Sequence, residues 1–445
     1  MTGKCMVAGA GILLLGLVVC APAPADGAAQ QPSQQPTYTI AEYNAYQAAA
    51  SEKNPQQRVA LLDDFVANFP KSTLLSYAYR TYYLTYYELK NYPKTVEYAD
   101  RLLAEGDKLD TLARLEALTA RTQAFFLGSS QKALGTPDQL NRARAAAADG
   151  LKVLGQWSKP DSMTPEQYAQ QKKSLGILFN SIAGIASISS KDYKAAVDSF
   201  RAVLALDPSD ALSTYRLGVA YLQQAPPQYM DGFWTVARSL ALKVPAEAQV
   251  RDYLRKQLQR YQQTGCDKLL TDQMNELLNL AAASTDRPTT YKIPSAAELD
   301  AARQNMTIVS LIADLKGGGD RAKLVWLAAC GLEFPDVPAK VIQATSGDAN
   351  VTLKLFTGAT SEEIEAGTTA NLEVRIEGQP EAKRIKKDDL LRFTGTLVSY
   401  TPEPFLLHWE KAKVNPEDIP PEKPQPGKHP AKRPPAKRPA KKAGR

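Results

Sequence analysis

Two glycines that lie 34 residues apart constrain the fold of this 445-residue chain more than any other feature. Gly184 and Gly218 each lie in an apolar segment of helical period, and Ser187 and Tyr221 repeat the same interval. Recurrence at such a period is typical of repeated helical hairpins, because each hairpin leaves an apolar face that only a neighbouring hairpin can cover. The sequence therefore predicts a stack of at least about three hairpins.

The clearest repeat runs from Ile177 to Asp210 and resembles the tetratricopeptide repeat. A small residue stands in its first helix, an alanine and an aromatic residue space the packing face of its second helix, and a proline ends the unit. Ser187 departs from the family pattern, which usually places an aromatic residue there. The resemblance implies that the repeats pack together through Gly184, Ala196, Phe200, Pro208, Gly218 and Tyr221.

The resemblance extends over about half of the chain. Earlier units are indicated by three sets of residues: Tyr46, Leu62, Phe65 and Pro70; Tyr79, Tyr83 and Tyr86 with Ala99 and Leu102; and a degenerate pair at 111–127 and 137–154. Pro226-Pro227 is expected to interrupt the second helix of the last unit. We therefore expect a mainly α fold, with a helical repeat domain over residues 37–283 and a helical connector over 284–320.

The apolar period changes to two after Gly317-Gly318-Gly319. Val351, Leu353 and Leu355 alternate with more polar neighbours, which is typical of half-buried strands. Five such strands are expected in a β domain over residues 321–415, at 337–345, 351–356, 371–377, 389–400 and 405–414. Five short strands resemble a small OB-type barrel. A sandwich remains open, because residues 378–387 show no helix between the third and fourth strands.

The N-terminal residues predict export. Lys4, an apolar run from Met6 to Val19 and the small residues of 21–25 follow the order of a secretory signal peptide over residues 1–25, and a Gln/Pro linker follows over 26–36. Lipidation of Cys20 is the alternative. No later run reaches the roughly 20 apolar residues of a membrane span. The expected location is the bacterial periplasm or cell envelope, with no transmembrane segment in the mature chain.

The basic character of the chain belongs to its C-terminus. Residues 421–445 contain nine Lys/Arg and one Glu, a net charge of +8, which leaves −1 for the rest of a chain whose total is +7. Repeated Ala-Lys-Arg-Pro units with almost no apolar side chains cannot form a core. A disordered tail over 416–445 is expected to bind anionic envelope surfaces as an electrostatic tether.

Few residues suit catalysis or metal binding. Only His408 and His429 could supply an imidazole, and His408 is expected to be a structural strand residue and not a catalytic base, because the sequence shows no signal of a partner. Cys266 and Cys330 have no zinc-ligand spacing, and the sequence favours two separate buried thiols over a disulfide between them. No cofactor or metal is expected. An enzyme with unassigned carboxylates is only the third reading.

The register of the repeats predicts a groove on the concave side of the stack. Its residues would be Tyr77, Arg80, Leu84 and Tyr87 in an early repeat, Leu178, Ser181, Ile185 and Ile188 in the clearest repeat, and Leu212, Tyr215, Val219 and Leu222 in the next. Apolar rows of this size usually mark binding sites. The helices between Val250 and Leu315 and an external peptide remain equal candidates to cover them.

These features favour an exported scaffold that holds a protein or peptide partner through the concave face. Nucleic-acid binding through the OB-like domain and the basic tail is the alternative, and export argues against it.

Overall fold

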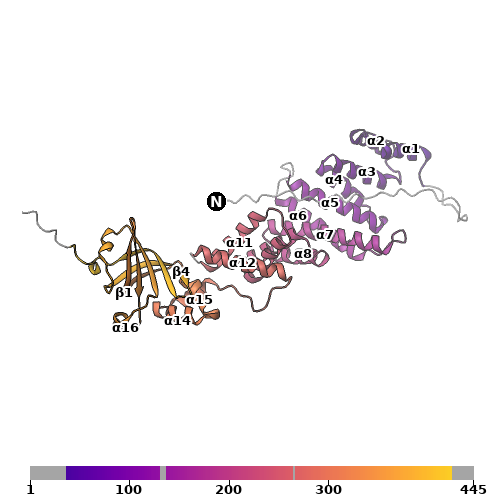
Figure 1. Ribbon diagram of the computed structural model, residues 1–445. Coiled ribbons are helices and arrows are strands. Elements are labelled where there is room, and N and C mark those ends of the chain that lie inside the picture. The colour runs from indigo at the N-terminus through magenta and orange to yellow at the C-terminus, as the bar shows by residue number, and fades with distance from the viewer. Residues whose placement is uncertain (1–36, 131–136, 264–265, 423–445) are drawn as a thin grey trace, which may run out of the picture. The chain divides into compact units, whose positions relative to one another are not determined.

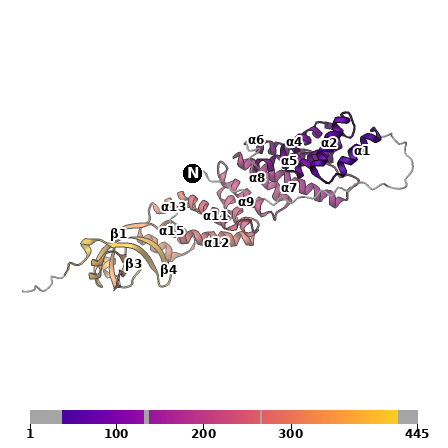
Figure 2. The same ribbon diagram turned by 90° about the horizontal axis from the view of Figure 1, so that it is seen from above.

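The computed structural model describes residues 37–130, 137–263 and 266–422 of the chain, drawn in Figures 1 and 2. The expected signal peptide and linker and the basic residues 423–445 lie outside the described residues. The chain divides into two compact units, residues 1–91 and 92–445. Within the described residues, no helix combines the length and the apolar character needed to cross a membrane.

Among residues 37–91, the described part of the first unit, there are three helices, α1 (Ile40–Ser51), α2 (Pro55–Asn68) and α3 (Leu75–Glu88). Thr39 and Glu42 cap α1 in a capping box, and the Asn54 side chain accepts hydrogen bonds from two backbone N–H groups of α2. Such caps satisfy backbone donors that have no partner inside the helix. Apolar side chains from all three helices form the core: Ala49, Leu62, Phe65, Ala78, Tyr82 and Tyr83.

The second unit begins with a run of helices that pack on one another in chain order. They are α4 (Tyr92–Leu103), α5 (Thr111–Ser130), α6 (Pro137–Gln156), α7 (Pro165–Ser189), α8 (Tyr193–Leu206), α9 (Ala211–Gln223), α10 (Tyr229–Ala241), α11 (Glu247–Gln262) and α12 (Asp267–Ala283). A short 3-10 helix, η1 (Gly106–Lys108), connects α4 and α5. The predicted stack of helical hairpins is confirmed.

Small residues allow the hairpins to close. Gly184 and Gly218 are buried on α7 and α9, where the ring of Phe200 and the side chain of Val236 approach them. Ala196 and Tyr221 are buried in the cluster that contains Phe200. Pro208 lies just beyond the end of α8.

Two helix boundaries differ from the sequence-based expectation. The helix of the clearest repeat is 25 residues long, because Pro165 starts it and Thr164 caps it well before Ile177. Pro226-Pro227 lies in the loop between α9 and α10 and interrupts no helix. Proline is tolerated there because the loop needs no N–H group for a helical hydrogen bond.

The region after α12 departs further from expectation. The helical connector expected over 284–320 contains two helices, α13 (Ala296–Arg303) and α14 (Ile308–Gly317), because Thr307 caps a new helix. The triple glycine does not start the strands. Gly318 and Gly319 have positive φ values and turn the chain into α15 (Gly319–Ala329), so the strands begin only at Glu333.

The five strands close into a barrel in the order β1-β2-β3-β5-β4. Their bounds are β1 (Glu333–Ser346), β2 (Asn350–Phe356), β3 (Leu372–Glu377), β4 (Leu390–Thr401) and β5 (Leu406–Val414). Neighbouring strands are antiparallel except β3 and β5, which are parallel. Figure 2 shows β1, β3 and β4 curving around the barrel. The closed sheet excludes a sandwich and is compatible with the OB-like barrel.

Short helices join these strands. Helix α16 (Ser361–Ala366) connects β2 to β3, and the 3-10 helix η3 (Pro380–Arg384) connects β3 to β4. Inside the barrel, the buried rings of Phe393 and Trp409 meet edge to face, with 5.4 Å between their centroids. Buried and more exposed side chains alternate along β4, as the period of two in the sequence predicted.

The barrel is tied to the helices that precede it. Leu311 and Leu315 of α14 and Val325 of α15 belong to the same core as the barrel strands, and the two helices lie against the barrel in Figure 1. A disulfide joins Cys266, at the start of α12, to Cys330, at the end of α15. The expectation of two separate thiols is therefore wrong.

The last described residues also belong to the barrel. A 3-10 helix, η4 (Pro416–Asp418), follows β5, and Ile419 is buried in the barrel core. Arg392 of β4 donates two side-chain hydrogen bonds to the carboxylate of Asp418. Residues 416–419 are therefore part of the folded barrel, and the tail predicted from residue 416 can begin only after them.

Candidate peptide-binding face

Aromatic and apolar side chains gather on the outer surface of α1 and α3. Among the described residues, seven large hydrophobic side chains are exposed, and four of them lie on these two helices. The exposed fractions are 81% for Ile40, 42% for Tyr43, 58% for Tyr77 and 39% for Leu84. We call the surface formed by Ile40, Tyr43, Tyr46, Tyr77, Thr81 and Leu84 the tyrosine face.

Helical spacing makes the tyrosine face continuous. Ile40, Tyr43 and Tyr46 follow one another at intervals of three on α1, and Tyr77, Thr81 and Leu84 at intervals of four and three on α3. Tyr46 joins the two rows. Its ring centroid lies 6.2 Å from that of Tyr77, and its hydroxyl lies 3.4 Å from Oγ1 of Thr81.

The rings of the face are held from below. Tyr46 packs against Phe65, whose side chain is buried in the core of the unit, with 6.0 Å between ring centroids. Tyr43 stacks on Tyr38 with a centroid distance of 5.9 Å and accepts a hydrogen bond from Nε2 of Gln47 at its hydroxyl. These contacts restrain the rings, so a ligand would find them largely ordered.

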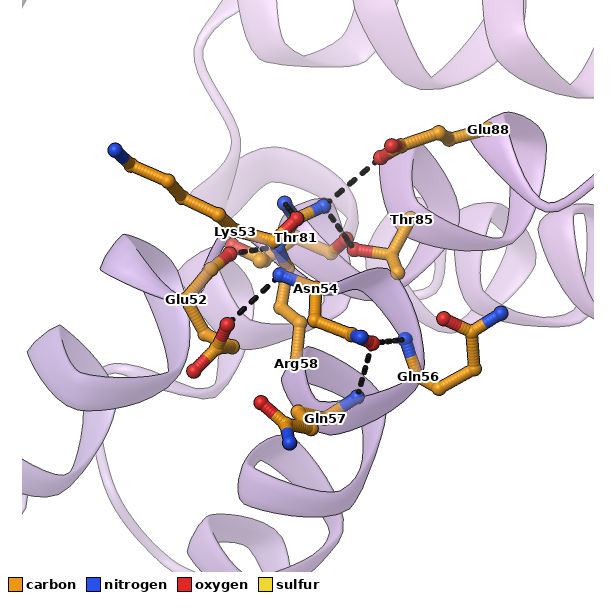
Figure 3. Close-up of polar contacts among 9 residues, drawn as sticks. All are labelled: Glu52, Lys53, Asn54, Gln56, Gln57, Arg58, Thr81, Thr85 and Glu88. Carbon is orange, nitrogen blue, oxygen red and sulfur yellow. Dashed lines mark hydrogen bonds and ion pairs between the residues drawn. The ribbon is translucent and has the colours of Figure 1, made fainter.

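Arg58 fixes the two helices of the face relative to each other (Figure 3). Its Nε donates to the carbonyl oxygen of Glu52 over 2.8 Å, in the turn between α1 and α2. Its Nη1 donates to Oγ1 of Thr85 over 3.3 Å and to Oε2 of Glu88 over 3.0 Å, both on α3. Arg58 is therefore a positioning residue, because its hydrogen bonds link the C-terminal ends of α1 and α3.

The electrostatic character of the face is close to neutral. Helices α1 and α3 together contain two glutamates, Glu42 and Glu88, and one arginine, Arg80. A hydrogen bond from the backbone N–H of Thr39 lowers the pKa of Glu42, which keeps a negative charge at the start of α1. Acidic groups are favourable at that end of a helix.

The four groove residues predicted in the early repeat differ from one another in exposure. Tyr77 and Leu84 are exposed and belong to the tyrosine face, whereas Arg80 and Tyr87 are partly buried. Sequence reasoning missed Ile40 and Tyr43. One signal could have found Tyr43, because it precedes Tyr77 by the repeat interval of 34 residues.

The groove residues predicted in the clearest repeat are partly buried. Leu178 packs against the cluster formed by Phe125 and its neighbours, and Ile185 and Ile188 pack against the cluster around Phe200. Ser181 lies between them in sequence and is also partly buried. These side chains therefore contribute to the packing between hairpins and leave only part of their surface to solvent.

The groove residues predicted in the repeat after the clearest one are covered by other helices of the chain. Leu222 is 5% exposed and lies in the core formed with α10, α11 and α12, against which Leu212 and Tyr215 also pack. The ring of Tyr215 meets that of Tyr253 on α11 edge to face at 5.9 Å. Val219 is partly buried. At Leu222 the expected groove is intramolecular core, because α11 continues the stack.

His408 has hydrogen-bonding partners that the sequence did not reveal. Its Nε2 lies 2.8 Å from Oγ1 of Thr401, and its Nδ1 lies 3.2 Å from Oε1 of Glu373. The three side chains join β3, β4 and β5. The strand position expected for His408 is correct, and its two partners lie on strands that no sequence signal linked to it. Among the described residues, no group of three His, Cys, Asp or Glu side chains is arranged to hold a metal ion.

Comparison with known proteins finds only distant structural similarity. No protein-family model and no curated protein matches the chain. The solved structure of the MamA RS-1 ArsTM double mutant is 17% identical, with a TM-score of 0.32, and the match covers 47% of this chain and 96% of that one. The C-terminal part of a TPR repeat-containing protein from Cytophaga hutchinsonii is 16% identical, with a TM-score of 0.26, over 56% of this chain and 96% of that one. At these TM-scores, the evidence for stacked hairpins is the packing of this chain's own helices.

Proposed function

We propose that this protein is an exported scaffold that binds a segment of a partner protein on the tyrosine face. The supporting observation is the concentration of exposed Ile40, Tyr43, Tyr77 and Leu84 on two helices that Arg58 holds together. Tyrosine suits this role because its ring supplies apolar contact area while its hydroxyl offers a hydrogen bond. Restrained aromatic side chains lose little entropy on binding and often supply most of the affinity.

Location in the cell envelope is part of this proposal. The disulfide between Cys266 and Cys330 supports it, because disulfides persist mainly in oxidising compartments outside the cytosol. The segment 1–25 has the order of a signal peptide. In this proposal the basic residues 423–445 act as a tether to anionic surfaces, with binding that weakens as salt concentration rises.

The OB-like barrel has less support as a nucleic-acid site. The outward side chains of β3 are Glu373, Arg375 and Glu377, and Arg375 forms an ion pair with Glu377 over 2.9 Å. A surface that tracks a nucleic-acid backbone needs an excess of positive charge. We therefore assign the barrel a structural or protein-binding role, and we infer no catalytic role for the Thr401, His408 and Glu373 chain.

Selection from a displayed peptide library tests the proposed function. We expect the full chain to enrich peptides with apolar side chains. Their affinity should fall at least about tenfold when Tyr77→Asp and Leu84→Asp are combined, because charge would then replace the central contacts. The control is Leu206→Asp with Leu390→Asp, which changes exposed apolar residues elsewhere. Peptides that bind both double variants equally well, or a failure to enrich any peptide, would contradict the proposal.

A further inference from the structure

A cavity of about 540 Å³ lies between the start of α8 and the chain that leaves α9. One wall is the turn before α8 and one face of that helix, where Lys194, Val197 and Arg201 follow one another at helical spacing. The other wall belongs to the segment 223–228, which runs from the end of α9 into the loop before α10. The cavity lies in the second unit and shares no residue with the tyrosine face.

Tyr221 orders both walls of the cavity. Its side chain is buried, and its carbonyl oxygen accepts a hydrogen bond from the N–H group of Gln228 over 2.9 Å, which holds the loop against α9. Its hydroxyl accepts a hydrogen bond from Nε of Arg201 over 2.7 Å, and the Arg201 guanidinium lies 5.4 Å from the centroid of the same ring. Arg201 is therefore held in place before any ligand arrives, which lowers the entropic cost of binding.

Three cations line the cavity, Lys191 in the turn and Lys194 and Arg201 on α8. Their side chains are exposed. Within the described part of the chain, the amino groups of the two lysines form no hydrogen bond or ion pair, and the hydrogen bond of Arg201 uses its Nε alone. The two terminal nitrogens of Arg201 are thus available to a carboxylate, which accepts parallel N–H bonds from a guanidinium.

The acidic residues of the cavity do not cancel this charge. Oδ2 of Asp192 pairs with Arg144 over 2.9 Å, and its Oδ1 accepts the N–H group of Ala195 in the first turn of α8. Asp198 is the other carboxylate at the cavity, against three cations. The segment 223–228 adds the amides of its glutamines, which both donate and accept hydrogen bonds. The cavity therefore suits a ligand that carries carboxylates and also exposes amide groups.

We propose that this cavity binds an acidic segment of a polypeptide. One carboxylate of the segment lies on Arg201 and another between Lys191 and Lys194, while the glutamine amides pair with the backbone of the segment. A volume of about 540 Å³ is within the range of small-ligand sites and has room for a few side chains. A phosphate group suits the site less well, because its second negative charge would lie close to Asp198. The site goes beyond the proposed function and does not depend on the tyrosine face.

Photocrosslinking on the full chain tests this site. The probe is a peptide of four glutamates around a central p-benzoyl-phenylalanine, and the matched probe has glutamines in place of the glutamates. Adducts are mapped by mass spectrometry. We expect the acidic probe to label residues 191–201 or 223–228, and the glutamine probe to label them at least about tenfold less. The basic residues 423–445 also attract an acidic peptide, so adducts confined to them would overturn the proposal.

Variants separate the cavity from the general charge of the chain. Lys191→Gln with Lys194→Gln should weaken binding of the acidic probe at least about fivefold, because two of the three cations are lost. Neither amino group has a contact that the fold needs, so the folded state should be unchanged. The matched control is Lys411→Gln with Lys413→Gln, which removes two exposed cations from β5. Equal losses in the two double variants would show attraction by net charge alone and would overturn the proposal.

Two further measurements identify the ligand. Asp198→Asn keeps an acceptor and removes a negative charge, so it should tighten binding of the acidic probe at least about twofold. Weaker or unchanged binding would count against the site. Glutarate should displace the probe more effectively than inorganic phosphate does, and the reverse order would assign the cavity to phosphate groups instead. Tyr77→Asp with Leu84→Asp should leave the labelling of the cavity unchanged, so the failure of one site is distinguishable from the failure of the other.

Discussion

The ring of Phe200 fills the space that a side chain at residue 184 would need, because a β-carbon at Gly184 would lie 2.7 Å from its Cζ atom. Gly184→Ala should therefore force α7 and α8 apart and destabilise the helical stack by about 1–3 kcal/mol. Thermal unfolding followed by circular dichroism measures this loss. Gly155→Ala is the matched control, since no atom lies within 4 Å of its β-carbon position. Equal melting temperatures for the two variants would refute the close approach.

Arg58→Met should loosen the tyrosine face. The change removes hydrogen bonds to Glu52 and Thr85 and the ion pair with Glu88, and we expect a loss of about 1–3 kcal/mol in the local stability of α1. Amide hydrogen exchange in residues 40–51 reports it. Arg142→Met removes only an exposed pair with Asp138 and should cost less than about 1 kcal/mol. Unaltered exchange in α1 would show that Arg58 does not position the face.

Removing the disulfide should destabilise the second unit. The bond between Cys266 and Cys330 closes a sequence separation of 64 residues, and its loss in Cys266→Ser with Cys330→Ser should cost about 2–4 kcal/mol. The midpoint of urea unfolding measures the change. Reduction with dithiothreitol should reproduce it in the natural sequence and should leave the double variant unaffected. A reductant effect of the same size on both proteins would contradict this.

The pair of Asp418 and Arg392 should make barrel stability depend on pH. Hydrogen bonds from the Arg392 side chain lower the pKa of Asp418 below its ordinary value of 3.8. A lowered carboxyl pKa stabilises the folded state above the ordinary value, and this contribution is lost as the pH falls through the folded pKa. Asp418→Asn should therefore be less stable than the natural sequence at pH 7, and the difference should shrink at acid pH. Urea unfolding monitored by barrel tryptophan fluorescence checks this, and a constant difference would disprove it.

Local patterns were enough to predict the helical stack. The spacing of Gly184, Ala196 and Phe200 is a property of neighbouring helices, and the same residues meet in the folded chain. The alternation around Val351 likewise predicted inward and outward positions in a strand. Such periodicities survive folding because they follow from the helix and strand geometry itself.

Contacts between distant segments could not be predicted in this way. No local pattern measures the distance between Cys266 and Cys330, and none shows that α11 brings the ring of Tyr253 against that of Tyr215. The contact between His408 and Glu373 depends on the parallel pairing of β3 and β5, which no local pattern specifies. The tyrosine face lies between these cases, because the 34-residue interval links Tyr43 to Tyr77 but does not reveal that both rings stay exposed.

The disulfide also decides how the protein would respond to mechanical load. If a partner pulled on the helical stack while the C-terminus was anchored, tension would pass from Cys266 directly to Cys330 through a covalent bond. The residues between them, which include α13 and α14, would then carry none of that tension. Stretching the chain would have to begin outside this loop, so the helices that support the barrel would be protected from extension until the bond is reduced.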